Sequence, residues 1–97
     1  MQLDRALKMS EEAIKKDSTN SSYLDTYGWI MYKLGRYSEA EEYIKKAIEL
    51  GDVSAVVLEH LGDVYEKLNK PDEAKKYWTK ALDKDQQNTA LREKIER

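Results

Sequence analysis

The sequence contains an internal repeat. Residues 21–54 recur, with substitutions, as residues 55–88. The small residues return after 34 positions, which pairs Gly28 with Gly62, Ala40 with Ala74 and Ala47 with Ala81. A period of this length is typical of repeat architectures, in which one unit cannot bury its apolar face alone and stacks on its neighbours. The small residues predict the points where neighbouring helices approach each other closely.

The first copy contains two helical patterns. Apolar residues recur at helical spacing from Ser21 to Leu34, and Gly35 then offers the left-handed conformation that commonly ends a helix. Ser38, with Glu41 three residues later, matches the capping-box pattern and predicts the start of the next helix. That helix is expected to reach about Leu50, just before Gly51.

The second copy follows the same plan. A helix is expected from Ala55 to Leu68, followed by a turn at Asn69. Pro71 then stands near the start of the next helix, where its fixed φ is favourable and its missing N–H costs nothing. A polar loop at 85–88 precedes a short terminal helix at 89–96, which carries Leu91 and Ile95 on one side. This last helix is expected to cover the final exposed interface.

The stretch before the first copy is half a unit. Ala6 and Ala13 lie one repeat period before Ala40 and Ala47, so residues 1–20 correspond to a second helix without the first helix of its pair. We therefore expect the chain to be part of a longer protein, or its exposed first helix to pair with a second copy as a weak homodimer. A monomer is the remaining alternative.

The repeated residues closely resemble those of the tetratricopeptide repeat (TPR) family, in which large apolar residues precede a Gly, an aromatic and an Ala at fixed spacing. The matching residues are Leu58, Leu61, Gly62, Tyr65, Ala74 and Trp78, and in the earlier copy Leu24, Tyr27, Gly28, Met31, Ala40 and Ile44. The resemblance implies an all-α solenoid of helical hairpins, a right-handed superhelix of about six helices. It implies one domain over residues 1–97: a partial repeat (1–20), two full repeats (21–54 and 55–88) and a capping helix (89–97).

Composition excludes several functional classes. The formal net charge is −2, so no general electrostatic field favours nucleic acid or anionic lipid. No apolar run approaches membrane-spanning length. The chain has no Cys, which removes disulfides, cysteine catalysis and thiolate metal sites.

The resemblance also implies that the first helices of the repeats line a concave groove. The positions that it assigns to this groove combine carboxylates with aromatic rings, which suits a basic or apolar segment of another protein. These candidate binding residues are Asp25, Trp29, Tyr32, Glu59, His60 and Asp63. Two alternatives stay open: the acidic residues only keep the surface soluble, and Trp29 packs between repeats.

One ligand mode known in the family is not expected here. It grips the C-terminal carboxylate of a chaperone with Lys, Asn and Arg side chains, and Asp25, Trp29, His60, Ala90 and Lys94 stand at the matching positions. Only Lys94 carries a suitable charge, and Asp25 would repel a carboxylate. Binding of a chaperone tail is therefore disfavoured.

The sequence favours a non-enzymatic protein-binding module without a cofactor. His60 is the only histidine, and with Asp63 and Glu59 on one open helix it lacks the converging ligands of a metal site. No nucleophile or oxyanion-binding loop accompanies it. The alternative function is structural, as a spacer or self-association unit of a longer solenoid.

Overall fold

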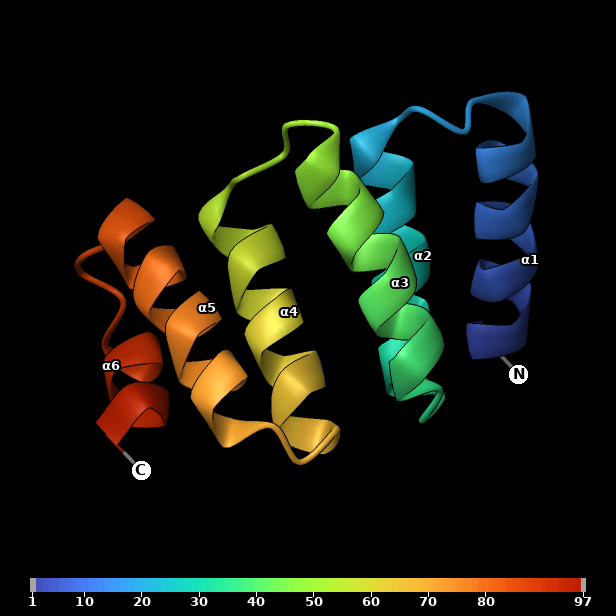
Figure 1. Ribbon diagram of the computed structural model, residues 1–97. Helices are drawn as coiled ribbons and strands as arrows, with labels where there is room; N and C mark the ends of the chain where they lie inside the picture. Colours follow the sequence, from blue (N-terminus) through green and yellow to red (C-terminus); the bar gives the residue numbers. More distant parts are fainter. Residues whose placement is uncertain (1, 97) are drawn as a thin grey trace. The chain divides into compact units, whose positions relative to one another are not determined.

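The computed structural model describes residues 2–96, which form six α-helices and no strand (Figure 1). The helices are α1 (Gln2–Lys16), α2 (Ser21–Lys33), α3 (Tyr37–Glu49), α4 (Ala55–Lys67), α5 (Pro71–Lys84) and α6 (Thr89–Glu96). The all-α prediction is confirmed, and the five helices predicted from residue 21 onward lie within one or two residues of the observed ones. The first helix, expected within residues 1–20, ends at Lys16. The chain divides into two compact units, residues 1–52 and 53–97.

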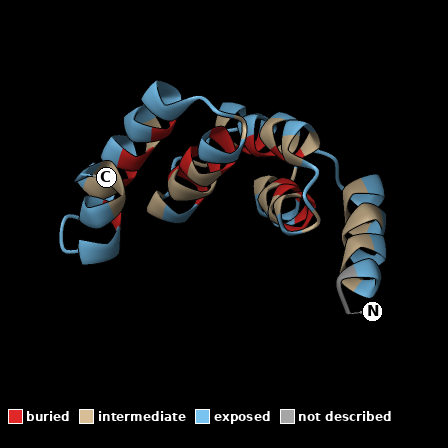
Figure 2. Ribbon diagram, turned by 90° about the horizontal axis from the view of Figure 1, so that it is seen from below, coloured by how far each residue is buried: buried red, intermediate tan, exposed pale blue. Residues whose placement is uncertain are grey.

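In the first unit, α2 and α3 form a helical hairpin that contains the core. The buried residues of the two helices include Leu24, Tyr27, Ile30, Met31, Ala40, Ile44 and Ala47. Figure 2 colours the buried stretches of the ribbon red. Gly28 lets the helices approach, because a Cβ at this position would lie 2.6 Å from Ile44 Cγ1 and 3.2 Å from the carbonyl oxygen of Ala40. Helix α1 packs on α2 but has no fully buried side chain between Asp4 and Lys16.

In the second unit, α4 and α5 repeat this hairpin and α6 packs on α5. Its buried side chains are Val57, Leu58, Leu61, Val64, Tyr65, Ala74, Trp78, Ala81 and Leu91. Gly62 faces the ring of Trp78, so closely that a Cβ would overlap the indole. Helix α6 contributes only Leu91 to the buried set.

Three helices end in the same hydrogen-bonded motif. After α2, the N–H of Arg36 donates to the carbonyl oxygen of Met31 (2.9 Å), and the N–H of Gly35 donates to that of Tyr32 (3.0 Å). This pair of bonds is the Schellman motif, and it requires a positive φ at Gly35, which is +80°. Gly51 ends α3 in the same way with φ +103°, and Asn69 ends α4 with φ +62°. The predicted turns at these three residues are confirmed.

The predicted capping box of Ser38 and Glu41 is wrong. Helix α3 begins at Tyr37, and its N-cap, Arg36, makes no side-chain hydrogen bond to the helix backbone. The turn that closes α2 already includes Arg36, so the next helix begins directly after it and Ser38 lies inside the helix. Arg36 instead holds the first turn through Glu39, with Nε and Nη2 at 2.9 and 2.7 Å from the two carboxylate oxygens.

The side-chain caps that do form precede the first helix of each hairpin and α6. Asn20 accepts a hydrogen bond from the N–H of Tyr23 (3.1 Å), Ser54 from that of Val57 (3.4 Å), and Asn88 from that of Leu91 (3.1 Å). The three capping residues are separated by one repeat period each, so the cap is part of the repeat. Each satisfies an N–H that the first turn of a helix leaves without a partner.

None of the helices in residues 2–96 has both the length and the apolar character needed to cross a membrane.

Candidate functional site

Three of the predicted binding residues lie on α2, in the first unit. Asp25, Trp29 and Tyr32 are spaced by four and three residues, so they share one face of the helix, and all three are partly exposed. The rings of Trp29 and Tyr32 stack with centroids 4.5 Å apart and planes 5° from parallel. Lys33 Nζ lies 6.0 Å from the centroid of Trp29. The stacked rings give this face a flat aromatic surface beside a carboxylate.

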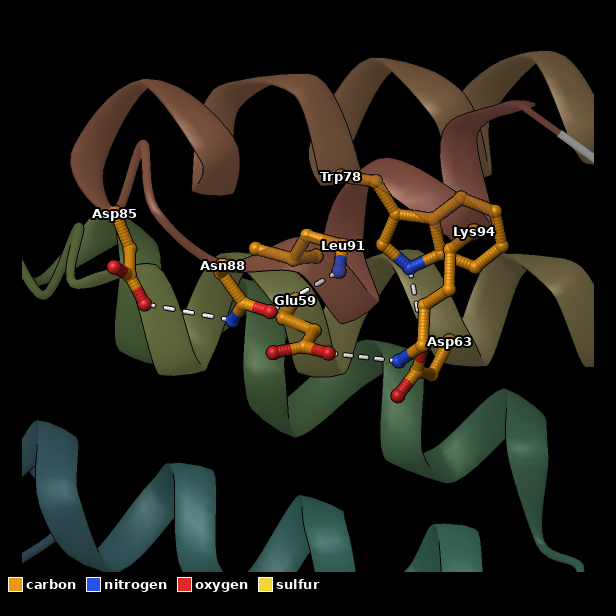
Figure 3. Close-up of polar contacts among 7 residues, drawn as sticks. All are labelled: Glu59, Asp63, Trp78, Asp85, Asn88, Leu91 and Lys94. Atoms are coloured by element: carbon orange, nitrogen blue, oxygen red, sulfur yellow. Dashed lines mark hydrogen bonds and ion pairs between the residues drawn. The ribbon is translucent and has the colours of Figure 1, made fainter.

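The other three predicted residues, Glu59, His60 and Asp63, lie on α4 in the second unit, and all are partly exposed. Two of them meet Lys94 of α6, whose Nζ is 2.7 Å from Glu59 Oε2 and 2.9 Å from Asp63 Oδ1 (Figure 3). Trp78 Nε1 donates a hydrogen bond of 3.0 Å to the same Asp63 oxygen. The side chains of Lys94, Glu59 and Asp63 are only 21%, 25% and 13% exposed. We call these four residues, Glu59, Asp63, Trp78 and Lys94, the α6 latch.

The positive charge of Lys94 allows two neighbouring carboxylates, Glu59 and Asp63, to be partly buried side by side. Like charges one helical turn apart repel each other, and partial burial strengthens the repulsion. Partial burial also lowers the pKa of Lys94, but the hydrogen bonds to Glu59 and Asp63 outweigh this effect and leave the pKa above its ordinary value of 10.5. The latch therefore holds its lysine charged and keeps one net negative charge.

The latch should make stability fall in alkaline solution. Because the folded pKa of Lys94 is above 10.5, its contribution to the free energy of unfolding is complete below pH 10.5 and is lost as pH rises through the folded value. The parent should lose unfolding free energy, measured with urea, between about pH 8 and about pH 11. We expect this loss to be smaller in Lys94→Met.

Lys45→Met is the matched control, since Lys45 is an exposed helical lysine outside the latch. It should leave the alkaline loss unchanged. Equal losses in the parent and in Lys94→Met would show that the latch does not couple Lys94 to folding.

The described residues hold no arrangement suited to metal chemistry. No group of three or more His, Cys, Asp and Glu side chains capable of holding a metal ion occurs among them. His60 lies between Glu59 and Asp63 in the sequence, but the two carboxylates bind Lys94.

Sequence analysis missed the role of Lys94 and the indole of Trp78 in this site. One signal was available in the repeat. Lys94 follows His60 by one repeat period, so the two residues hold equivalent positions on equivalent helices. Glu59 and Asp63 lie on either side of His60 in the sequence. Adjacent equivalent helices could therefore have been expected to bring the lysine to these carboxylates.

The comparisons with known proteins agree with this architecture. A family model described as "Psidin, N-terminal TPR repeats region" matches residues 1–95. None of the curated proteins matches the chain. Among solved structures, YrrB, described as "a TPR protein with an unusual peptide-binding site", is 26% identical with a TM-score of 0.88, over 97% of this chain and 48% of that one.

Two further structures share the fold. TTC0263, described as a thermophilic TPR protein in Thermus thermophilus, is 25% identical with a TM-score of 0.83, over 96% of this chain and 47% of that one. The first TPR of Spaghetti (RPAP3), solved with the HSP90 peptide SRMEEVD, is 19% identical with a TM-score of 0.92, over 98% of this chain and 75% of that one. The chain spans about half the length of YrrB and TTC0263. With helical hairpins that recur at a fixed period and a family model matched over nearly its whole length, the chain belongs to the tetratricopeptide repeat family.

Proposed function

We propose that this chain is a non-enzymatic module that binds a segment of another protein. The proposed contact residues are Asp25, Trp29 and Tyr32 on α2, and Glu59, His60 and Asp63 on α4. The observation that carries the proposal is the stacked pair of Trp29 and Tyr32, which is partly exposed on a helix whose opposite face forms the core. Rigid aromatic rings of this kind supply much of the binding energy at protein interfaces.

The side chains on α2 and α4 indicate which kinds of partner residue they would bind. The face of α2 offers aromatic rings and the carboxylate of Asp25, a combination that favours apolar or cationic side chains. On α4, the carboxylates of Glu59 and Asp63 already bind Lys94, so a basic side chain there would compete with this lysine. Family membership supports protein binding in general, since YrrB and the RPAP3 domain are both described with peptides.

Trp29→Ala is expected to weaken capture of a protein partner by about tenfold, because removing one central aromatic residue commonly costs more than about 1 kcal/mol of binding energy. The measurement is cross-linking and affinity capture from a lysate, quantified by mass spectrometry for parent and variant side by side. Circular dichroism should show the same helix content in both.

Tyr23→Ala is the control, because Tyr23 is a 41% exposed aromatic residue on the other side of α2. It should leave capture unchanged. The assignment of Trp29 is wrong if its variant captures every partner as well as the parent, or if both variants lose capture equally.

One observation favours the alternative of self-association. Ala6 and Ala13 of α1 are only half-buried, whereas Ala40, Ala47, Ala74 and Ala81 at the equivalent positions are completely buried. Nearby, the Met9 side chain is 65% exposed. A solution mass that rises with concentration, and returns to the monomer in Leu7→Glu, would support this second function.

A further inference from the structure

Helix α6 is attached to α4 and α5 by few side chains. Asn88 caps its first turn, Leu91 is completely buried, and Lys94 closes the α6 latch on Glu59 and Asp63 (Figure 3). Ile95 is half-buried and the other described residues of the helix, from Thr89 to Glu96, are exposed. The docking of α6 therefore depends on the pattern Asn-x-x-Leu-x-x-Lys.

A helix of this kind is stable only while it is docked. It has eight residues, and isolated helices shorter than about 12 residues are marginal in water. Because α6 has one completely buried side chain, we expect it to open at a lower free energy than α4 and α5. When it opens, the buried surface of α4 and α5 and the two carboxylates are exposed together.

The surface beneath α6 continues past the latch. A pocket of about 90 Å³ lies next to Lys94, between α4 and α5. Its lining residues are Glu66, Pro71, Ala74, Lys75, Trp78 and Lys94. The volume equals that of about three water molecules, which is enough for one aliphatic side chain. The described residues of α6 leave this pocket unfilled, so the surface has room for one side chain more than α6 places on it.

From these observations we propose that the α4–α5 surface under α6 is a binding site for a helix of another protein, which takes the place of α6. The partner helix carries a Leu, a Lys three residues later and a second Leu four residues after the Lys. The first Leu replaces Leu91, the Lys binds Glu59 and Asp63, and the second Leu fills the pocket beside Trp78. This site goes beyond the proposed contacts with α2, because it lies wholly in the second unit and does not involve Trp29.

Displacement is feasible because α6 is held by few side chains, chiefly Leu91 and Lys94, and has the further advantage of belonging to the same chain. A segment of the same chain competes as if it were present at a millimolar concentration. A separate partner helix must therefore make stronger contacts than α6 in order to displace it. The filled pocket supplies such a contact, and the net negative charge of the carboxylate pair favours a cationic helix over an anionic one.

The test uses a fluorescent, amidated peptide with the sequence of residues 87–97 followed by one Leu. It is titrated into the whole chain and into its Leu91→Asp variant, in which a buried carboxylate expels α6. Anisotropy should report binding to the variant at least about tenfold tighter than to the parent, because the competing helix is released. A peptide with Lys94→Ala should bind the variant about tenfold more weakly. A final Ser in place of the added Leu should also weaken binding, by at least about threefold.

A second variant protects the test against loss of folding in Leu91→Asp. Lys94→Ala keeps Leu91 and should still gain at least about threefold in affinity for the first peptide, since α6 then lacks its ion pair. The proposal is overturned if the peptide binds parent and both variants equally, or if its own Lys94→Ala form binds as well. Adding Trp29→Ala to Leu91→Asp should leave the affinity unchanged, so failure here is distinguishable from failure of the contacts proposed on α2.

Discussion

Replacing Trp78 with alanine should lower the free energy of unfolding by about 3–5 kcal/mol, the usual cost of truncating a buried aromatic side chain to alanine. The indole is 3% exposed, packs against Gly62 and donates its N–H to Asp63. The variant leaves a cavity between α4 and α5 and removes a donor from a carboxylate in the α6 latch. Because small proteins are stable by only about 5–15 kcal/mol, this is a large share of the total.

The chain provides its own matched control for this prediction. Its two tryptophans lie in different units, Trp29 in residues 1–52 and Trp78 in residues 53–97. Trp29 is partly exposed, so Trp29→Ala should cost clearly less than Trp78→Ala. In each variant the remaining indole reports by fluorescence on the unit that contains it, while circular dichroism follows both units. Equal losses of stability in the two variants would contradict the burial that distinguishes them.

Helix boundaries could be predicted because their signals are local. Gly35, Gly51 and Pro71 mark ends and starts through their own backbone preferences, whatever the rest of the chain does. The start of α3 was mispredicted because it depends on how the preceding turn closes, and Ser38 matches a capping pattern although it already lies inside the helix. Pro71 follows Tyr37 by one repeat period and begins α5, so comparison of the two copies would have given the correct start.

The candidate site was harder to predict because its contacts join distant residues. Lys94 is 35 residues from Glu59 and 31 from Asp63, and neither pair has a local sequence signal. A carboxylate on a helix surface is equally consistent with a solvated group and with a binding group, because composition does not show which residues lie near it in the folded chain. The position of Trp29 beside the buried stripe could be read from helical periodicity, but its stacking on Tyr32 depends on side-chain conformation.

Gly62→Ala tests whether the contact between α4 and α5 has no room for a side chain at this position. Helix propensity and packing predict changes in stability of opposite sign. Alanine in a helix interior is favoured over glycine by about 1 kcal/mol. The new methyl group, however, would overlap Cδ1 and Nε1 of the buried Trp78 ring, whose N–H is held by Asp63. Overpacking of this kind costs about 1–3 kcal/mol. We therefore expect net destabilisation of up to about 2 kcal/mol, seen as a lower urea midpoint with an unchanged slope.

The same substitution in a Trp78→Ala background separates the two effects. Without the indole, the added methyl meets none of the atoms that it would otherwise overlap, so only helix propensity remains and Gly62→Ala should stabilise the double variant by about 1 kcal/mol. This reversal of sign measures the coupling between the two positions directly. At Gly28 the nearest atom is Cγ1 of Ile44, and Gly28→Ala should likewise destabilise the first unit. If Gly62→Ala stabilises the parent chain, close contact at this glycine does not hold the hairpin together.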